Sequence, residues 1–132
     1  MPDCSTRLFT DACSFRIERR SPSTVLVCIE GHDVGEFGPL PMRCIEAFMP
    51  DELPVELFVD ARGTRGASMD VSNDWAAWLG RNRLRFSAIR MLTASKYVQF
   101  TAGFVRRFSE LEGVMRVYED AAAFDAELAA RT

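Results

Sequence analysis

The stretch of residues 55–72 constrains the fold of this chain more than any other part of the sequence. It opens with an apolar run that ends at Asp60, which is the pattern of a buried strand. A short polar segment with two glycines follows, and Ser68, Asp70 and Ser72 then offer three candidate caps for an aromatic-rich helix. Proteins of alternating strands and helices usually place their sites where a strand leads through a loop into a helix. We therefore expect the functional site here.

The rest of the chain continues this alternation. A β-branched run at residues 24–29 predicts a second buried strand, and the later apolar segments alternate between strand and helix spacing. The expected strands cover residues 7–19, 24–29, 55–60, 86–92 and 115–118, and the expected helices cover 40–49, 70–83, 96–111 and 120–130. Helical connections between strands predict an α/β fold with a mixed, mostly parallel sheet, in which the first strand is an antiparallel edge.

Length and charge exclude several classes of protein. The 132 residues suit one domain, which we place at 1–132 with a loose terminus at 1–6. The formal net charge of -3 argues against a nucleic-acid partner, because such binding needs a basic surface. No segment has the roughly 18 unbroken apolar residues of a membrane span, and the first residues lack an apolar signal segment. We therefore expect a cytoplasmic protein with no membrane span.

The cysteines and the single histidine give no pattern of a metal site. The four cysteines have none of the spacings of metal ligands. Cys28 lies in a strand pattern and Cys44 in a helical one, so we expect reduced thiols packed in the core. The sequence does not exclude a disulfide between Cys4 and Cys13. The residues favour no metal and no cofactor.

A catalytic hypothesis rests on His32 and Asp33, with Ser68 or Cys44 as the nucleophile. Adjacent residues in a turn usually point apart. The segment around Ser68 also lacks the second glycine of a nucleophile elbow. A solvated loop histidine is the simpler interpretation, so we expect that the chain is not an enzyme.

A ligand hypothesis rests on the segment between the strand and the helix. Gly63, Arg65 and Gly66 stand in a glycine-bearing loop before the helix at 70–83, with Arg62 nearby. An anion or nucleotide at this helix N-terminus is therefore an alternative function. The segment matches neither of the common phosphate-binding motifs, and a flexible connection with a helix cap explains the same residues.

Most aromatic residues fall at the spacing of core positions. Trp75 and Trp78 lie on the helix at 70–83, and a partly exposed tryptophan there would suit an interface. A homodimer through these residues or through an open sheet edge is compatible with the sequence. The arginine clusters at residues 81–85 and 106–107 are typical of solvated helix ends.

The order of elements resembles the STAS domain of anti-sigma-factor antagonists and sulfate transporters. Three short segments carry the resemblance, together with the layout of residues 8–130. They are Ile29-Glu30-Gly31-His32-Asp33, Leu57-Phe58-Val59-Asp60 and Met69-Asp70-Val71-Ser72. The chain looks most similar to bacterial STAS-like proteins of the sporulation-antagonist type. The resemblance implies a mixed sheet of four or five strands with helices mainly on one face.

The resemblance also implies a non-enzymatic regulatory module that binds a protein partner. In this family, a kinase that is also an anti-sigma factor phosphorylates a hydroxyl at the start of the second long helix, and the added charge repels an acidic partner. Val71 stands at the usual acceptor position here, so either Ser68 or Ser72 takes the phosphate or the switch is absent. The residues implied in the switch or in docking are therefore Asp60, Ser68, Asp70 and Ser72.

Overall fold

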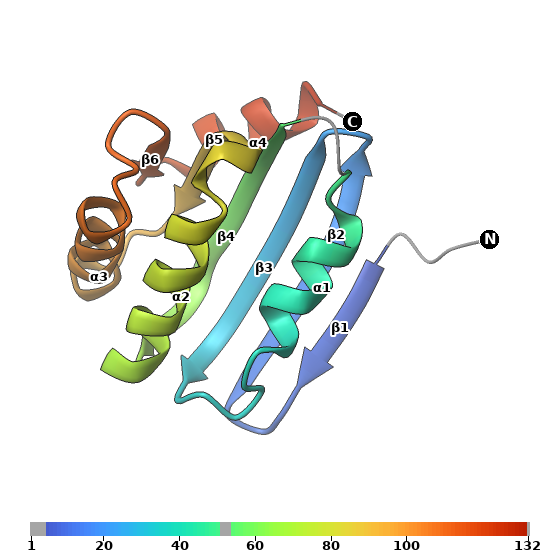
Figure 1. Cartoon of the computed structure of the whole chain (residues 1–132). Coiled ribbons are helices and arrows are strands. Elements are labelled where there is room, and N and C mark those ends of the chain that lie inside the picture. Colours follow the sequence, from blue (N-terminus) through green and yellow to red (C-terminus); the bar gives the residue numbers. More distant parts are fainter. Residues whose placement is uncertain (1–4, 51–53, 132) are drawn as a thin grey trace.

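The structure, a computed structural model, describes residues 5–50 and 54–131 (Figure 1). This part of the chain forms one mixed sheet with its strands in sequence order. The strands are β1 (Ser5–Phe9), β2 (Cys13–Ser21), β3 (Thr24–Asp33), β4 (Val55–Ala67), β5 (Phe86–Leu92) and β6 (Met115–Tyr118). The helices are α1 (Leu40–Phe48), α2 (Met69–Arg81), α3 (Lys96–Phe108) and α4 (Ala121–Ala129), with a short 3-10 helix, η1 (Arg83–Arg85).

The direction of the strands changes at β3. Strands β1, β2 and β3 pair antiparallel, whereas β3, β4, β5 and β6 pair parallel. Helices connect the parallel strands, because parallel neighbours need a crossover connection. The expected mixed, mostly parallel sheet with an antiparallel edge is confirmed.

The sheet has six strands in the described residues, whereas the sequence predicted four or five. The difference lies at the first strand, since residues 7–19 form a hairpin of two strands. Thr10 makes the turn, because its backbone N–H donates to the Cys13 carbonyl at 2.8 Å and its Oγ1 accepts from the Cys13 N–H at 3.2 Å. Strand β1 begins at Ser5, so the terminus predicted as loose enters the sheet there.

Three helices cover one face of the sheet and α4 covers the other (Figure 1). The larger core lies under α1, α2 and α3, and its fully buried members include Phe15, Ile45, Leu57 and Ile89. The smaller core centres on Phe124 of α4, which packs edge-on against Phe58 at 5.5 Å. Helices mainly on one face were therefore correctly expected. No helix among the described residues is long and apolar enough to cross a membrane.

The polar segment that follows Asp60 is strand rather than loop. Strand β4 continues to Ala67 and stays paired with β3, which itself continues to Asp33, with shifts of register between Cys28 and Glu30 and between Gly31 and His32. The prediction of a strand end at Asp60 and of a loop over residues 61–67 was therefore wrong. Glycine allows this extension where space is short: Gly31 has a φ of 89°, and a Cβ there would lie 2.1 Å from the Ala12 carbonyl oxygen.

Candidate functional site

The end of β4 leads directly into α2 through Ser68. The Ser68 N–H donates to the Asp33 carbonyl at 2.9 Å, which continues the pairing of β3 with β4 by one residue. The Ser68 Oγ then accepts from the Val71 N–H at 3.2 Å and caps the helix. The strand end and the helix N-terminus are therefore fixed to each other at the edge of the sheet where α/β proteins bind ligands.

The hydroxyls and carboxylate predicted for a switch differ in exposure. Ser68 is half-buried and Asp70 is exposed at the first turn of α2. Ser72 is only 3% exposed, and its hydroxyl donates to the Ser68 carbonyl at 3.0 Å. A protein kinase would reach the Ser68 hydroxyl more easily than the Ser72 hydroxyl, which faces the protein interior.

Asp60 lies on the other face of the sheet. Successive side chains of a strand point to opposite faces, and Val59 and Ala61 face α2 and α3 while Asp60 faces the side of α4. The Asp60 carboxylate accepts from Arg62 Nε at 2.9 Å, and Arg62 also pairs with Asp125 of α4 at 2.5 Å. Asp60 is therefore not brought together with Ser68, Asp70 and Ser72.

The residues predicted to hold an anion are also divided between the faces. Gly63 and Arg62 line a polar hollow of about 230 Å³ on the side of α4, whereas Gly66 lines the side of α2. Arg65 is exposed and lines neither. Because β4 is a strand here, it separates side chains that a loop would have gathered around one ligand.

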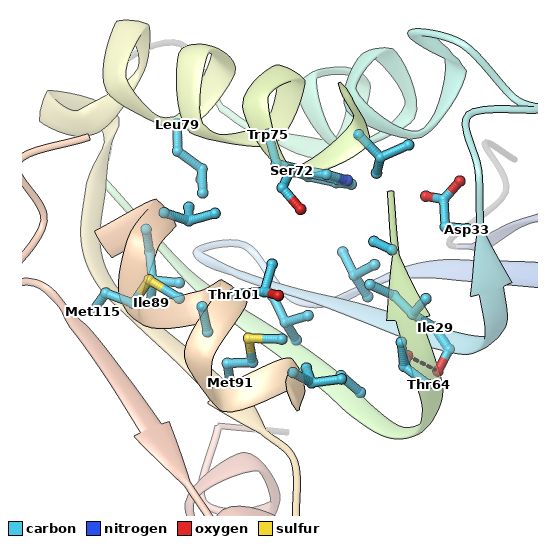
Figure 2. Close-up of a pocket in the computed structure, with 18 of the residues that line it drawn as sticks. Ile29, Asp33, Thr64, Ser72, Trp75, Leu79, Ile89, Met91, Thr101 and Met115 are labelled. Atoms are coloured by element: carbon cyan, nitrogen blue, oxygen red, sulfur yellow. Dashed lines mark hydrogen bonds between the residues drawn. The ribbon is translucent and has the colours of Figure 1, made fainter. Parts of the chain in front are cut away.

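A cavity of about 110 Å³ lies between the sheet and the facing sides of α2 and α3. Figure 2 shows the side chains of both helices pointing into the space above β3, β4 and β5. The lining is almost entirely aliphatic or aromatic. It includes Val27, Ile29, Ile45, Leu57, Val59, Val71, Trp75, Leu79, Ile89, Met91, Val98, Ala102, Val105 and Met115. Apolar cavities of about 150 Å³ in proteins stay dry and bind molecules such as benzene.

A few polar groups lie at the wall of this cavity. Thr64 donates its hydroxyl to the Ile29 carbonyl at 3.0 Å, so its own bonding is satisfied within the sheet (Figure 2). Asp33 is 6% exposed and accepts from the Gly35 N–H at 2.9 Å. Burial raises the pKa of the Asp33 carboxyl above its ordinary value, although the bond from Gly35 opposes the shift. Asp33 therefore offers a hydrogen-bond acceptor at the edge of an apolar site.

The two tryptophans are core residues with different surroundings. Trp75 is half-buried, lines the cavity and stacks on Phe15 with ring centroids 6.3 Å apart. Trp78 is 2% exposed, and its Nε1 donates to Glu46 Oε1 at 2.6 Å. Trp78 thus links α2 to α1 by a hydrogen bond and offers no exposed area for a dimer interface. Trp75 instead forms part of the cavity wall.

The structure does not bring together the residues of the catalytic hypothesis. His32 is exposed near the end of β3, and among the described residues no hydrogen bond joins its ring to a serine or cysteine. Its neighbour Asp33 is turned inward to the cavity wall. Whether the chain is an enzyme stays a prediction.

Cys13, Cys28 and Cys44 are free thiols, and Cys4 lies outside the described residues. Cys13 is 3% exposed, and burial, with Asp33 and Glu36 nearby, raises the pKa of its thiol to about 12. Among the described residues, no group of three histidine, cysteine, aspartate or glutamate side chains converges as metal ligands would.

The sequence named residues at the strand–helix junction as a site, but it predicted no cavity there. Val98, Ala102 and Val105 of α3 fall at helical spacing, which reads as ordinary core packing. The available signal was the small side chain of Ala102 between larger ones, because a small residue opposite another helix leaves space. That signal alone does not distinguish a cavity from close helix packing.

Comparison with known proteins identifies the type of fold. No family model and no curated protein sequence matches the chain. Among solved structures, the chain is similar to an uncharacterised protein of the DUF3478 family from Shewanella loihica PV-4, which has a SpoIIAA-like fold. The match covers 92% of this chain and 98% of that one, with a TM-score of 0.62 and 13% sequence identity.

This chain has a SpoIIAA-like fold. That is the fold of the anti-sigma-factor antagonists and STAS domains that the three sequence segments resemble, so the resemblance is confirmed at the level of the fold. The low identity carries no activity or partner from one protein to the other, because one fold supports many functions. The function must therefore be argued from the site.

Proposed function

We propose that this chain is a non-enzymatic binding module whose cavity between the sheet, α2 and α3 holds a small apolar molecule. The observation that carries the proposal is the cavity of about 110 Å³ with its aliphatic and aromatic wall. Ligand sites are mostly apolar with a few polar groups, usually in pockets of roughly 300–1,000 Å³. The smaller volume here limits the ligand to a molecule no larger than about benzene.

The lining favours an apolar ligand over the anion or nucleotide considered from the sequence. Among the described residues that line the cavity, the one charged side chain is Asp33, which is acidic and would repel an anion. Arg62 faces the opposite side of the sheet, and Arg65 is exposed outside the cavity. A neutral ring or a short branched chain fits the space, and a hydroxyl on it would donate to Asp33.

The test is a titration with small neutral molecules such as benzene and short aliphatic alcohols, followed by tryptophan fluorescence and by the shift in melting temperature. A ligand that binds only the native state raises the melting temperature as its concentration passes the dissociation constant. The variant Ala102→Leu fills the cavity and should abolish the shift. Its control is Ala77→Leu, on the exposed side of α2, which should retain it.

Two outcomes would count against this function. One is the absence of any stabilisation by the whole panel of neutral molecules. The other is equal stabilisation of the wild type and Ala102→Leu, which would place the binding elsewhere. Circular dichroism of each variant shows whether it is folded, so that loss of binding is separated from loss of structure.

We also propose, as a second candidate, regulatory docking of a protein partner at the N-terminus of α2. It is supported by the SpoIIAA-like fold and by two exposed neighbours at the start of the helix. Met69 is 65% exposed, and Asp70 is also exposed. Ser68 is the hydroxyl there that a kinase would reach. Mass spectrometry of the chain from its native cells should find phosphate on Ser68, and none in Ser68→Ala. A chain that carries no phosphate under any growth condition would argue against the switch.

A further inference from the structure

Helix α3 presents aromatic side chains on the face that points away from the cavity. Phe100 and Phe108 are 74% and 69% exposed, and the half-buried Phe104 lies between them and stacks on Phe108 at 5.4 Å. Residues four apart lie on one face of a helix, so these three rings form a continuous stripe. We call Phe100, Phe104 and Phe108 the aromatic stripe.

The exposed apolar surface continues past the end of α3. Helices α2 and α3 meet at their C-terminal ends, where Ser109 Oγ donates to the Ala76 carbonyl at 2.6 Å. Helix η1 follows α2 directly, and Arg83 in it lies 3.9 Å from Glu110. Leu84 in η1 is 89% exposed, the highest value among the large apolar residues that the structure describes. Leu84 therefore stands near the same end of the molecule as Phe108.

The segment that carries this surface differs in charge from the whole chain, although Glu110 and Glu112 follow just after Phe108. Residues 75–109 contain seven arginines and lysines and no aspartate or glutamate, although the chain has 16 basic and 19 acidic side chains. The members at the helix ends are Arg81, Arg83, Arg85, Lys96, Arg106 and Arg107. Among the described residues, Arg83 and Lys96 have acidic partners, whereas Arg81, Arg85, Arg106 and Arg107 form no ion pair.

We propose that the aromatic stripe and Leu84, with the arginines around them, dock on an anionic lipid surface. Phenylalanine and leucine at the boundary of headgroups and acyl chains, with arginine and lysine beside them, are the composition of helices that lie in a membrane interface. An acidic membrane attracts such a basic segment, although the whole chain is acidic. Figure 1 places α3 at the outer edge of the fold, where a flat surface can approach it.

The two faces of α3 would then have different roles. The inner face, with Val98, Ala102 and Val105, walls the cavity, and the outer face carries the aromatic stripe. A small apolar molecule dissolved in a bilayer would meet the cavity across one helix. Docking does not rest on the proposed function, because lipid binding and ligand binding are measured separately.

The test is co-sedimentation of the full chain with vesicles of phosphatidylcholine, either pure or containing phosphatidylserine as the minority lipid. We expect binding to the vesicles with phosphatidylserine and little to the pure ones. Salt near 1 M should weaken it strongly, because the screening length falls to about 3 Å. The double variant Phe100→Ser/Phe108→Ser should bind at least about tenfold more weakly, since two exposed rings lose their apolar contact.

Matched controls distinguish binding through this surface from nonspecific adsorption of the protein to vesicles. Phe9 is 71% exposed on β1, so Phe9→Ser removes an exposed ring elsewhere and should leave binding unchanged. Arg107→Gln should weaken binding several-fold, whereas Arg19→Gln, an exposed arginine on β2, should not. Equal binding to both vesicle types, or equal binding of the stripe variant and Phe9→Ser, would overturn the proposal. No binding to any vesicle would also overturn it and leave the surface to an acidic protein partner.

Discussion

Ser109 donates its hydroxyl hydrogen to the carbonyl of Ala76 at 2.6 Å, and this bond joins the C-terminal end of α3 to α2. Ser109 is 3% exposed, and a Cβ at Gly80 would lie 3.8 Å from the Ser109 Cα. The two helices that wall the cavity are thus fixed to each other at one end. Their separation there is set by a small residue on each side.

Ser109→Ala should test this link. We expect a loss of about 1 kcal/mol in the free energy of unfolding, the usual net contribution of one buried hydrogen bond. Urea denaturation measures it. Ser87→Ala is the control, because Ser87 is exposed on β5. A Ser109→Ala variant as stable as Ser87→Ala would show that packing alone holds the two helices together.

Asp33→Asn should stabilise the protein at neutral pH. Because burial raises the Asp33 pKa in the folded state, ionisation costs folding free energy that grows as the pH rises above the unfolded pKa and is complete above the raised pKa. This cost vanishes below the unfolded pKa of about 3.9, where both states are protonated. The amide keeps the oxygen that accepts from the Gly35 N–H. Unfolding free energies across the pH range should show a gain for Asp33→Asn near neutrality that disappears in acid, and a pH-independent difference would refute it.

Glu56 should show the opposite pH dependence. Burial raises its pKa, but the hydrogen bonds and charges of Arg131 and Arg90 outweigh burial and hold the pKa below its ordinary value. The stabilisation is therefore present above the unfolded pKa of about 4.3 and is lost as the pH falls below it. Glu56→Gln should cost about 1–3 kcal/mol at neutral pH, as for a lost charged hydrogen bond. Thermal unfolding at neutral and acidic pH measures this difference, which should shrink in acid.

Two glycines should respond to alanine in opposite ways. Gly31→Ala places a Cβ 2.1 Å from the Ala12 carbonyl oxygen at a φ of 89°, so we expect a loss of at least about 1–3 kcal/mol. Gly103 lies inside α3, where an added Cβ would have no described neighbour within 4 Å, so Gly103→Ala should gain about 0.5–1 kcal/mol. Melting temperatures measure both effects. A stable Gly31→Ala variant would mean that the β2–β3 pairing near Ala12 relaxes easily.

The helices and the later strands followed from the sequence because their signals are local. The apolar spacing and the three candidate caps placed α2 to within a residue or two, and the short apolar runs placed β5 and β6 at the residues observed. The ends of β3 and β4 did not follow, because pairing between residues about 30 positions apart holds polar, glycine-rich segments in the sheet. Glu30 and Gly63, for example, lie opposite each other across the two strands.

The sequence predicted a site at the junction of β4 and α2 but no cavity beside it. The N-terminus of α2 and the end of β4 border the cavity, whereas the sequence pointed to a switch, docking or an anion at this junction. The face on which each side chain lies was missed, because a loop imposes no alternation and a strand does. The family resemblance assigned Asp60 and Ser72 to the same switch or docking surface, yet the two residues lie on opposite sides of the sheet.

The unbroken course of β4 from Val55 to Ala67 also limits how this chain can vary during evolution. Surface loops accept insertions and deletions, and the glycines here give the segment the composition of one. In a paired strand, however, removing one residue moves every following side chain to the opposite face. Strand β4 already has one residue more than β3 between Asp60 and Gly63 and again between Thr64 and Gly66. A deletion at either place removes a bulge, whereas a deletion elsewhere in β4 would turn the cavity wall outward, so relatives that keep the cavity should lose residues only at these two places.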